Sequence, residues 1–123
     1  ENVGLRTKNN VLFDLPEYIA LFDIFPQAGA LLDTGHAHVN GWDIPAVVQA
    51  LGERLTACHV HDNDGSGDAH LPVGQGDIDW KAYFGAVKKY APQATQVFEY
   101  CCGFNNTKDL EAHIAELKRN YKL

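Results

Sequence analysis

Short apolar runs alternate with longer amphipathic segments along the whole chain. Strand-like runs are expected at residues 28–32, 55–60 and 95–100, and residues 1–3 are expected to end a fourth strand. Each run is followed by a segment whose apolar residues recur at the i, i+3, i+4, i+7 spacing of a helix that buries one face. These stripes are Leu15, Tyr18, Ile19 and Phe22; Ile44, Val47, Val48 and Leu51; Trp80, Phe84 and Val87; and Leu110, Ile114, Leu117 and Tyr121. Asp14, Asp79 and Asn106 are expected to cap the helices they precede.

This order of elements predicts an α/β fold. Strands that alternate with helices through short connections form a parallel sheet with right-handed crossovers and helices on its outer face. Four such β/α units are half of an eight-stranded barrel, so residues 1–123 are expected to form a single partial domain, the C-terminal half of a TIM barrel. An open doubly wound sheet has the same periodicity, and the polar residues on the strands favour the barrel. Half a barrel has two open edges, so we expect an N-terminal half-barrel or an oligomer partner to cover them.

The composition narrows the classes of function. A formal charge of −6 is unsuited to neutralising phosphates along a duplex, so no nucleic-acid partner is expected. No apolar run approaches the length of about eighteen residues that crosses a bilayer, so no membrane partner is expected either. Three cysteines, two of them adjacent, fit neither a disulfide framework nor a zinc knuckle, which favours reduced thiols and a cytoplasmic location. A small-molecule substrate is the expectation that remains.

Charged and imidazole side chains occur where apolar strands end. Asp33, His59, His61 and Glu99 lie in or directly after the expected strands. Buried charge must be paired or must coordinate a metal, and the carboxyl ends of barrel strands meet at one mouth. Each residue also has a simpler interpretation: Asp33 as a turn cap, His59 as a core histidine, and His61 as either a pocket residue or a hydrogen-bonded packing residue. Their occurrence on neighbouring strands favours a shared metal site.

Five segments together resemble the second half of the sugar phosphate isomerase/epimerase family. They are Glu1-Asn2-Val3, Asp33-Thr34-Gly35-His36, residues 59–64, residues 68–80 and Phe98-Glu99-Tyr100. This family belongs to the xylose isomerase-like superfamily and shares its fold with endonuclease IV and the ketose 3-epimerases. The stretch from His59 to Trp80 is the most specific part of the resemblance.

The resemblance implies a ligand set that the strands alone do not define. Glu1, Asp33, His59 and Glu99 match the family's metal ligands, and Glu1 and Glu99 also match the acid/base pair of the ketose epimerases. Three oxygen donors and one nitrogen suit Mn²⁺, Mg²⁺ or Co²⁺ at least as well as Zn²⁺. Residues that match substrate-binding or second-metal positions, or that face the same pocket, are His36, Asp68, His70 and His61.

The function expected from these residues is that of a metal-dependent isomerase or epimerase. Its substrate would be a small sugar, sugar phosphate or hydroxy-ketone that reacts through an enediolate, although the isolated half need not be active. A multi-zinc phosphodiesterase resembling endonuclease IV is an alternative, because Asp68 and His70 match a pair that holds a further zinc in that enzyme. A polyol dehydratase is another alternative, and it would use the same metal site as the isomerase. A binding module that has the fold but no catalytic activity is a third.

Overall fold

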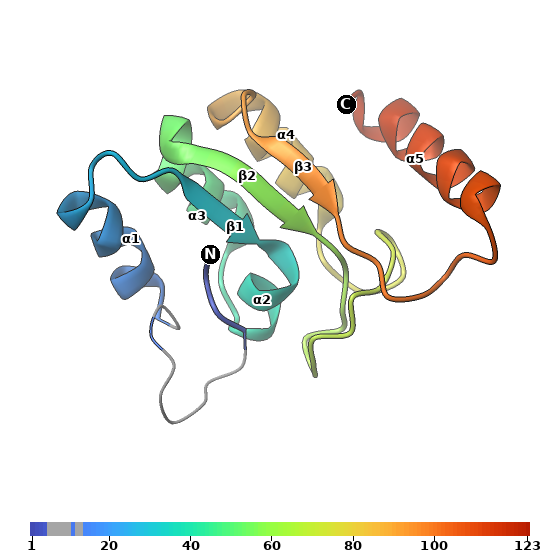
Figure 1. Ribbon diagram of the computed structural model, residues 1–123, viewed down its shortest axis with the longest axis horizontal. Coiled ribbons are helices and arrows are strands. Elements are labelled where there is room, and N and C mark those ends of the chain that lie inside the picture. The colour runs from blue at the N-terminus through green and yellow to red at the C-terminus, as the bar shows by residue number, and fades with distance from the viewer. Residues whose placement is uncertain (5–10, 12–13) are drawn as a thin grey trace.

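The sheet has three parallel strands. The computed structural model describes residues 1–4, 11 and 14–123, and its strands are β1 (Ala30–Asp33), β2 (Leu55–Val60) and β3 (Thr95–Phe98). They lie in the order β1-β2-β3 (Figure 1), so each strand pairs with the next one along the chain. Asp33 is opposite His59 and Val60 is opposite Phe98 in the register, which aligns the carboxyl ends of all three strands.

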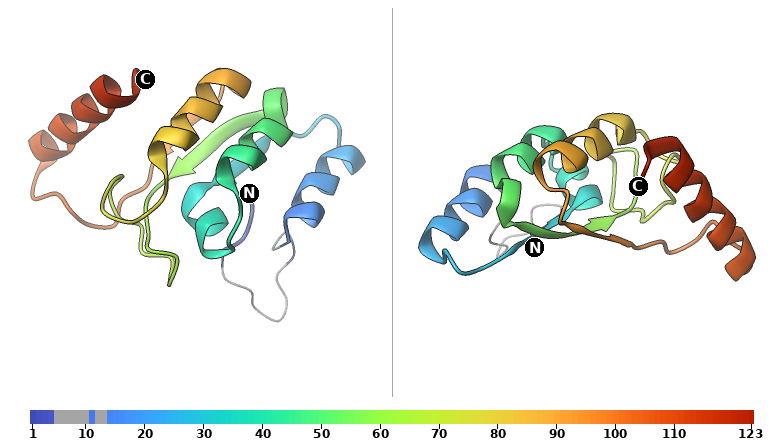
Figure 2. Two further views of the ribbon diagram at one scale, coloured as in Figure 1. Left: turned by 180° about the vertical axis from the view of Figure 1, so that it is seen from behind. Right: turned by 90° about the horizontal axis from the view of Figure 1, so that it is seen from above.

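The helices pack on one side of this sheet. In chain order the helices are α1 (Leu15–Ile24), α2 (Thr34–Val39), α3 (Ile44–Leu51), the 3-10 helix η1 (Gly52–Arg54), α4 (Trp80–Tyr90) and α5 (Thr107–Tyr121). Helices α3 and α4 cover one face of the strands, while α1 and α5 lie at its two sides (Figure 2). The opposite face carries no helix among the described residues. Val97 in β3 is 40% exposed.

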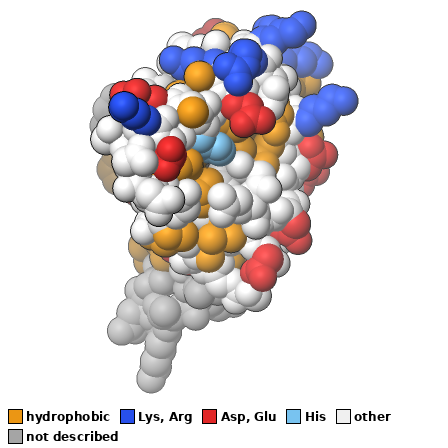
Figure 3. All heavy atoms as spheres, turned by 90° about the vertical axis from the view of Figure 1, so that its right-hand side faces the viewer, with side chains coloured by type: hydrophobic (Ala, Val, Ile, Leu, Met, Phe, Trp, Pro, Cys, Tyr) orange, Lys and Arg blue, Asp and Glu red, His pale blue; other side chains and the backbone are white. Residues whose placement is uncertain are grey.

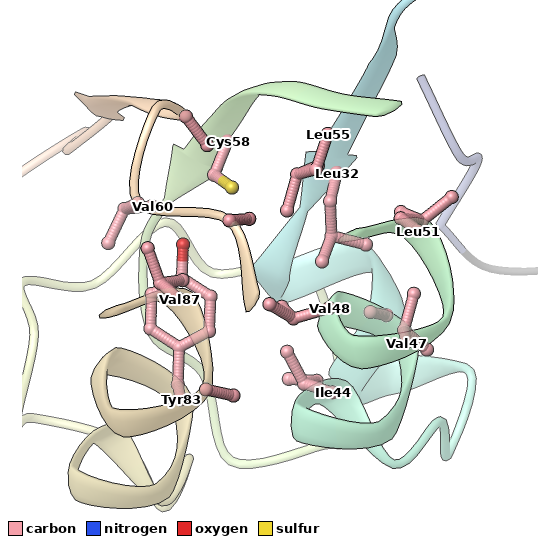
Figure 4. Packing of buried hydrophobic residues seen from close by; sticks show 14 of the residues in the cluster. Leu32, Ile44, Val47, Val48, Leu51, Leu55, Cys58, Val60, Tyr83 and Val87 are labelled. Atoms are coloured by element: carbon pink, nitrogen blue, oxygen red, sulfur yellow. The ribbon is translucent and has the colours of Figure 1, made fainter. Parts of the chain in front are cut away.

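Apolar side chains fill the layer between strands and helices (Figure 4). Leu32, Leu55 and Cys58 from the strands are fully buried, and they meet Val48 of α3 and Tyr83 of α4. Burying one such aliphatic side chain contributes roughly 1.5–3 kcal/mol. Successive side chains of a strand point to opposite faces of the sheet. Because Leu32 and Cys58 point toward the helices, their neighbours Asp33 and His59 point to the face without helices.

Two of the three expected helix caps are confirmed. Asp79 accepts a hydrogen bond from the backbone N–H of Ala82, and Asn106 accepts one from Asp109. Asp14 precedes α1 but makes no side-chain capping bond. Basic side chains occupy the last turns of α4 and α5, where they interact favourably with the helix dipole. Lys and Arg gather at one end of the face that includes α5 (Figure 3).

One strand prediction was wrong, and one helix was not predicted. Residues 1–3 form no strand, because the side-chain amide of Asn2 takes the place of a neighbouring strand: its Oδ1 accepts from the backbone N–H of Asp33 at 2.8 Å and its Nδ2 donates to the carbonyl of Asp33 at 3.1 Å. Helix α2 was not predicted, because its six residues are too few to show a periodic stripe.

The part of the chain that the structure describes contains no helix long and apolar enough to cross a membrane.

Candidate metal centre

The four predicted metal ligands meet at the carboxyl ends of the strands. Asp33 is the last residue of β1, His59 is opposite it in β2, and Glu99 follows β3, where its N–H donates to the carbonyl of Val60 at 3.1 Å. Glu1 approaches from the N-terminal segment. The expectation that these strands present their polar residues at one edge is therefore met by the backbone register.

One ring nitrogen is at the centre of this group. His59 Nδ1 lies 3.6 Å from Glu1 Oε2, 3.7 Å from Asp33 Oδ2 and 3.5 Å from Glu99 Oε2. Donor atoms of Glu1, Asp33 and His59 lie within 4.8 Å of one another, and Glu99 adjoins them through its contact with His59 Nδ1. Donor atoms bound to one ion at about 2.0–2.2 Å are themselves about 3–4 Å apart, so the spacing of the first three residues fits a shared ion. Three carboxylates around one imidazole also leave an excess of negative charge, which a cation would neutralise. We call these four residues the first cluster.

Burial separates the members of the first cluster into two kinds. The Asp33 side chain is 1% exposed and that of His59 is 21% exposed, whereas those of Glu1 and Glu99 are 39% and 37% exposed. The two glutamates are therefore the carboxylates that a small molecule could reach. Asp33 and His59 form the floor of the cluster.

A second cluster lies beside the first. Asp68 Oδ2 is 3.2 Å from His36 Nε2 and 3.3 Å from His70 Nε2, and donor atoms of all three residues lie within 4.8 Å of one another. His36 comes from α2, and Asp68 and His70 come from the long segment between β2 and α4. His36 Nδ1 is also 3.5 Å from Glu1 Oε1, which places the two clusters side by side.

His61 is the eighth predicted residue; it is hydrogen-bonded to Asp33, and its donor atoms also lie within 4.8 Å of those of His70 and Glu99. Its ring is fully buried, and its Nε2 lies 3.0 Å from Asp33 Oδ1 and 3.1 Å from Asp33 Oδ2. Asp33 also caps α2, because its Oδ1 accepts from the N–H of His36 at 2.8 Å. The turn-cap interpretation of Asp33 is therefore correct, and it is compatible with a place in the first cluster.

Asp33 and His61 perturb each other's ionisation. Burial raises the pKa of Asp33, but hydrogen bonds from His61 and from the His36 N–H outweigh it, so the pKa is lowered. Burial lowers the pKa of His61, but the hydrogen bond to Asp33 and the charges of Asp33, Asp68 and Glu99 outweigh it and raise that pKa. The structure thus favours an ionised Asp33.

Sequence reasoning missed the residue that holds the second cluster in place. Asp62 is fully buried and its carboxylate accepts four hydrogen bonds, from the N–H groups of Asn63, Gly74 and Ile78 and from Trp80 Nε1. These bonds tie both ends of the segment that carries the second cluster. A buried position was predictable, because Asp62 lies two residues after an apolar strand, but three of its four donors are 12 to 18 residues away in sequence.

Thr34 was also missed. Its Oγ1 lies 3.1 Å from the carbonyl of His59 and 3.0 Å from that of His61, and it accepts from the N–H of His61 at 3.2 Å. This hydroxyl fastens the start of α2 to the end of β2. Because Thr34 directly follows Asp33, these bonds also help to fix the position of Asp33 relative to His59.

Comparison with known proteins agrees with this architecture. The xylose isomerase-like TIM barrel family matches residues 3–120. The chain belongs to this family. The α/β fold with parallel strands, part of a TIM barrel, is therefore confirmed for this xylose isomerase-like chain.

Individual relatives of the xylose isomerase-like chain are longer than it is. It is 35% identical to the uncharacterized protein y4fM of Sinorhizobium fredii over 87 residues, which are 69% of this chain and 28% of that protein. It is 37% identical to the uncharacterized protein MJ1311 of Methanocaldococcus jannaschii over 54 residues, 42% of this chain and 18% of that protein. The chain therefore spans less than a third of either relative.

A solved structure shows the same fold. The crystal structure of a D-tagatose 3-epimerase-like protein superposes with a TM-score of 0.73 over 98% of this chain and 44% of that one. The sequences are 22% identical, so this likeness concerns the fold.

Proposed function

We propose that this chain supplies the divalent-metal centre of a sugar isomerase or epimerase. The observation that carries the proposal is the first cluster, in which three carboxylates lie 3.5–3.7 Å from His59 Nδ1. Oxygen donors with one imidazole suit Mn²⁺, Mg²⁺, Co²⁺ or Zn²⁺. Membership of the xylose isomerase-like family and the fold shared with a tagatose epimerase-like protein support the same class of reaction.

The side chains divide the proposed chemistry between them. Asp33 and His59, the less exposed pair, would hold the ion together with Glu1 and Glu99. A bound divalent ion would stabilise the negative charge of an enediolate formed from a small sugar, sugar phosphate or hydroxy-ketone. Glu1 and Glu99 are exposed enough to reach the substrate. One of them would remove the proton beside the carbonyl and the other would return a proton, which interconverts the isomers or epimers.

The rest of the barrel is part of the proposal. The open sheet face and its edges would be closed by an N-terminal half-barrel or by an oligomer partner, and a carbohydrate would bind at the completed mouth. The exposed side chain of Val97 on β3 supports this, because a buried barrel interior would cover it. The longer relatives are consistent with a further half.

One observation favours a second candidate function. The second cluster groups two imidazoles and a carboxylate, a donor set that suits Zn²⁺. Together the two clusters would suit a multi-zinc phosphodiesterase, in which neighbouring ions stabilise the attacking and leaving oxygens. The acidic charge of −6 opposes a nucleic-acid substrate for such an enzyme.

Ion stoichiometry and affinity separate the two candidates. After chelation and reloading, one tightly bound ion per chain supports the isomerase, and two or more zinc ions per chain support the phosphodiesterase.

Glu99→Gln keeps the shape of the side chain but removes its charge, so Mn²⁺ should bind at least about tenfold more weakly. The matched control is Asp64→Asn, which removes an exposed carboxylate outside both clusters and should leave the affinity unchanged. Equal affinities for wild type and Glu99→Gln would remove Glu99 from the centre.

The proton transfer has its own assay. With the proposed barrel mouth completed, the protein should exchange the carbon-bound hydrogen beside the carbonyl of a ketohexose with deuterium from D₂O, which NMR detects. Glu99→Gln should abolish this exchange, and Asp64→Asn should not affect it. Exchange that survives Glu99→Gln at the wild-type rate would contradict the acid/base role.

A further inference from the structure

Two adjacent cysteines follow β3 beside the second cluster. Cys101 and Cys102 are both free and exposed, and they come directly after Tyr100 at the end of the strand segment. The thiol of Cys102 makes a hydrogen bond with that of Cys101, which raises the pKa of the Cys102 thiol. Both residues line an open cavity of about 620 Å³ between the end of β3 and α5. The two sulfur atoms are therefore neighbours that a small solute can reach.

The backbone around Cys101 holds the segment that carries Asp68 and His70 of the second cluster. The Cys101 N–H donates to the carbonyl of His70 at 3.1 Å, and the Cys101 thiol donates to the carbonyl of Ala69 at 3.2 Å. In addition, His70 Nδ1 is 3.3 Å from the carbonyl of Glu99. These three contacts join the end of β3 to the second cluster.

The two segments are packed closely against each other. Gly103 has a φ of +94°, and a Cβ atom there would overlap the ring of Pro72. His70 has a φ of +47°, a left-handed conformation that is unfavourable for a residue with a side chain. The contacts around His70, including the bond from the Cys101 N–H, hold it in this conformation. A change in the backbone at residues 101–102 would therefore be transmitted to His70.

A disulfide between consecutive residues would impose such a change. Disulfides usually join Cα atoms about 4.4–6.8 Å apart, whereas consecutive Cα atoms across a trans peptide are only about 3.8 Å apart. Closing the ring would therefore rotate the backbone of Cys101 and Cys102, and it would also remove the S–H group that donates to Ala69. Strained and exposed disulfides are easily reduced, which is typical of regulatory disulfides.

We propose that Cys101 and Cys102 are a peroxide-sensitive modification site whose oxidation loosens the second cluster. One sulfur attacks an oxygen of hydrogen peroxide, the O–O bond breaks, and a sulfenic acid and water form. The other sulfur attacks the first, the S–O bond breaks, and a disulfide and a second water form. The two thiols lose two electrons to the peroxide, and their protons leave in the two waters. The bonds from Cys101 to Ala69 and His70 are then lost.

Mass spectrometry of chelator-treated protein tests the oxidation. Hydrogen peroxide should remove two hydrogen atoms from the tryptic peptide 90–108, which contains Cys101 and Cys102 but not Cys58, and dithiothreitol should restore them. The chain contains no Met, which peroxide would also oxidise. Cys102→Ser is the control and should not form this product. Sulfinic acids or a disulfide between two chains in place of this product would overturn the proposal.

Amide exchange tests the link to the second cluster. The Leu71 N–H donates to the carbonyl of Asp62 at 2.9 Å, so its exchange with solvent reports how firmly the segment after His70 is held. Oxidation of wild type should speed this exchange about tenfold, and dithiothreitol should reverse the change. The matched control combines Cys101→Ser with Cys102→Ser, which keeps a hydroxyl donor at position 101, and its exchange should not respond to peroxide.

Two outcomes decide this link separately from the proposed function. Unchanged exchange at Leu71 in fully oxidised wild type would overturn the link between the cysteines and the second cluster. Both measurements are made without metal, so a protein that binds no ion would refute the proposed function and leave this test intact.

Discussion

Replacing Asp62 with Asn tests how much one buried carboxylate stabilises the segment between β2 and α4. Asp62 Oδ1 accepts from the N–H groups of Asn63 at 3.0 Å and Ile78 at 3.3 Å, and Oδ2 accepts from Gly74 at 2.9 Å and Trp80 Nε1 at 2.7 Å. An amide has one acceptor oxygen, so either orientation of Asn leaves two donors facing an NH₂ group. Each buried donor left unsatisfied costs about 1–3 kcal/mol, so the free energy of unfolding should fall by roughly 2–6 kcal/mol.

Urea denaturation followed by circular dichroism measures this loss. With a slope of about 2 kcal/mol per M, the midpoint should fall by at least about 1 M without a change in slope. Asp14→Asn is the matched control, since Asp14 is exposed and makes no side-chain capping bond; its effect should stay within about 0.5 kcal/mol. A midpoint for Asp62→Asn equal to that of the control would show that the four bonds do not hold the segment.

Three further predictions concern the same framework. Gly76→Ala should reduce the free energy of unfolding by about 1–3 kcal/mol in urea titrations, because a Cβ there would overlap Asp62 Oδ1 and the carbonyl of Asn63; an unchanged midpoint would contradict this. The folded-state pKa of His61 is raised above 6.5, so in the presence of chelator its stabilising contribution should be complete below about pH 6 and lost as the pH rises through that raised value. Unfolding titrations across this range should show a smaller loss in His61→Gln, and identical profiles would refute the assignment. Tyr18→Phe removes the hydroxyl that donates at 2.7 Å to a carbonyl of β1, and should cost about 1 kcal/mol in the same assay unless that bond contributes nothing.

Periodicity predicted the parts of the fold that bury a continuous apolar face. Residues 55–60 were predicted with the observed bounds of β2, and the stripe that begins at Ile44 marks α3, because both elements pack against the same core. The short elements carry too few residues for such a signal. Helix α2 begins where Asp33 caps it, and the short element shows only this cap in the sequence. Asn2 takes the place of a strand through two hydrogen bonds to Asp33, a partner 31 residues away that sequence spacing does not reveal.

The candidate site was predictable to the extent that strand register determines it. Asp33 and His59 share one level of the sheet, so their polarity in apolar strands was enough to expect them together. Asp68 and His70 lie in a segment without regular structure, and only the resemblance to a family indicated their place. The bonds of Asp62 that position this segment cross up to 18 residues of sequence, and no periodic pattern encodes them.

The hydrogen-bond donors around each group give chemically similar carboxylates in this chain different roles. Asp62 and Asp33 are almost completely buried, but Asp62 is surrounded by four neutral N–H donors, which satisfy its charge without any ion. Asp33 has the His36 N–H and the His61 ring on one side and faces His59 and the glutamates on the other. Glu1 and Glu99 have no comparable set of donors among the described residues, and they lie 3.5–3.6 Å from His59 Nδ1 at the open edge. Carboxylates that the protein does not neutralise are those most favourable to a cation, and in the described chain they converge on one imidazole where the strands end. The satisfied carboxylate therefore builds the frame, and the unsatisfied ones define the place where a metal ion and a substrate would meet.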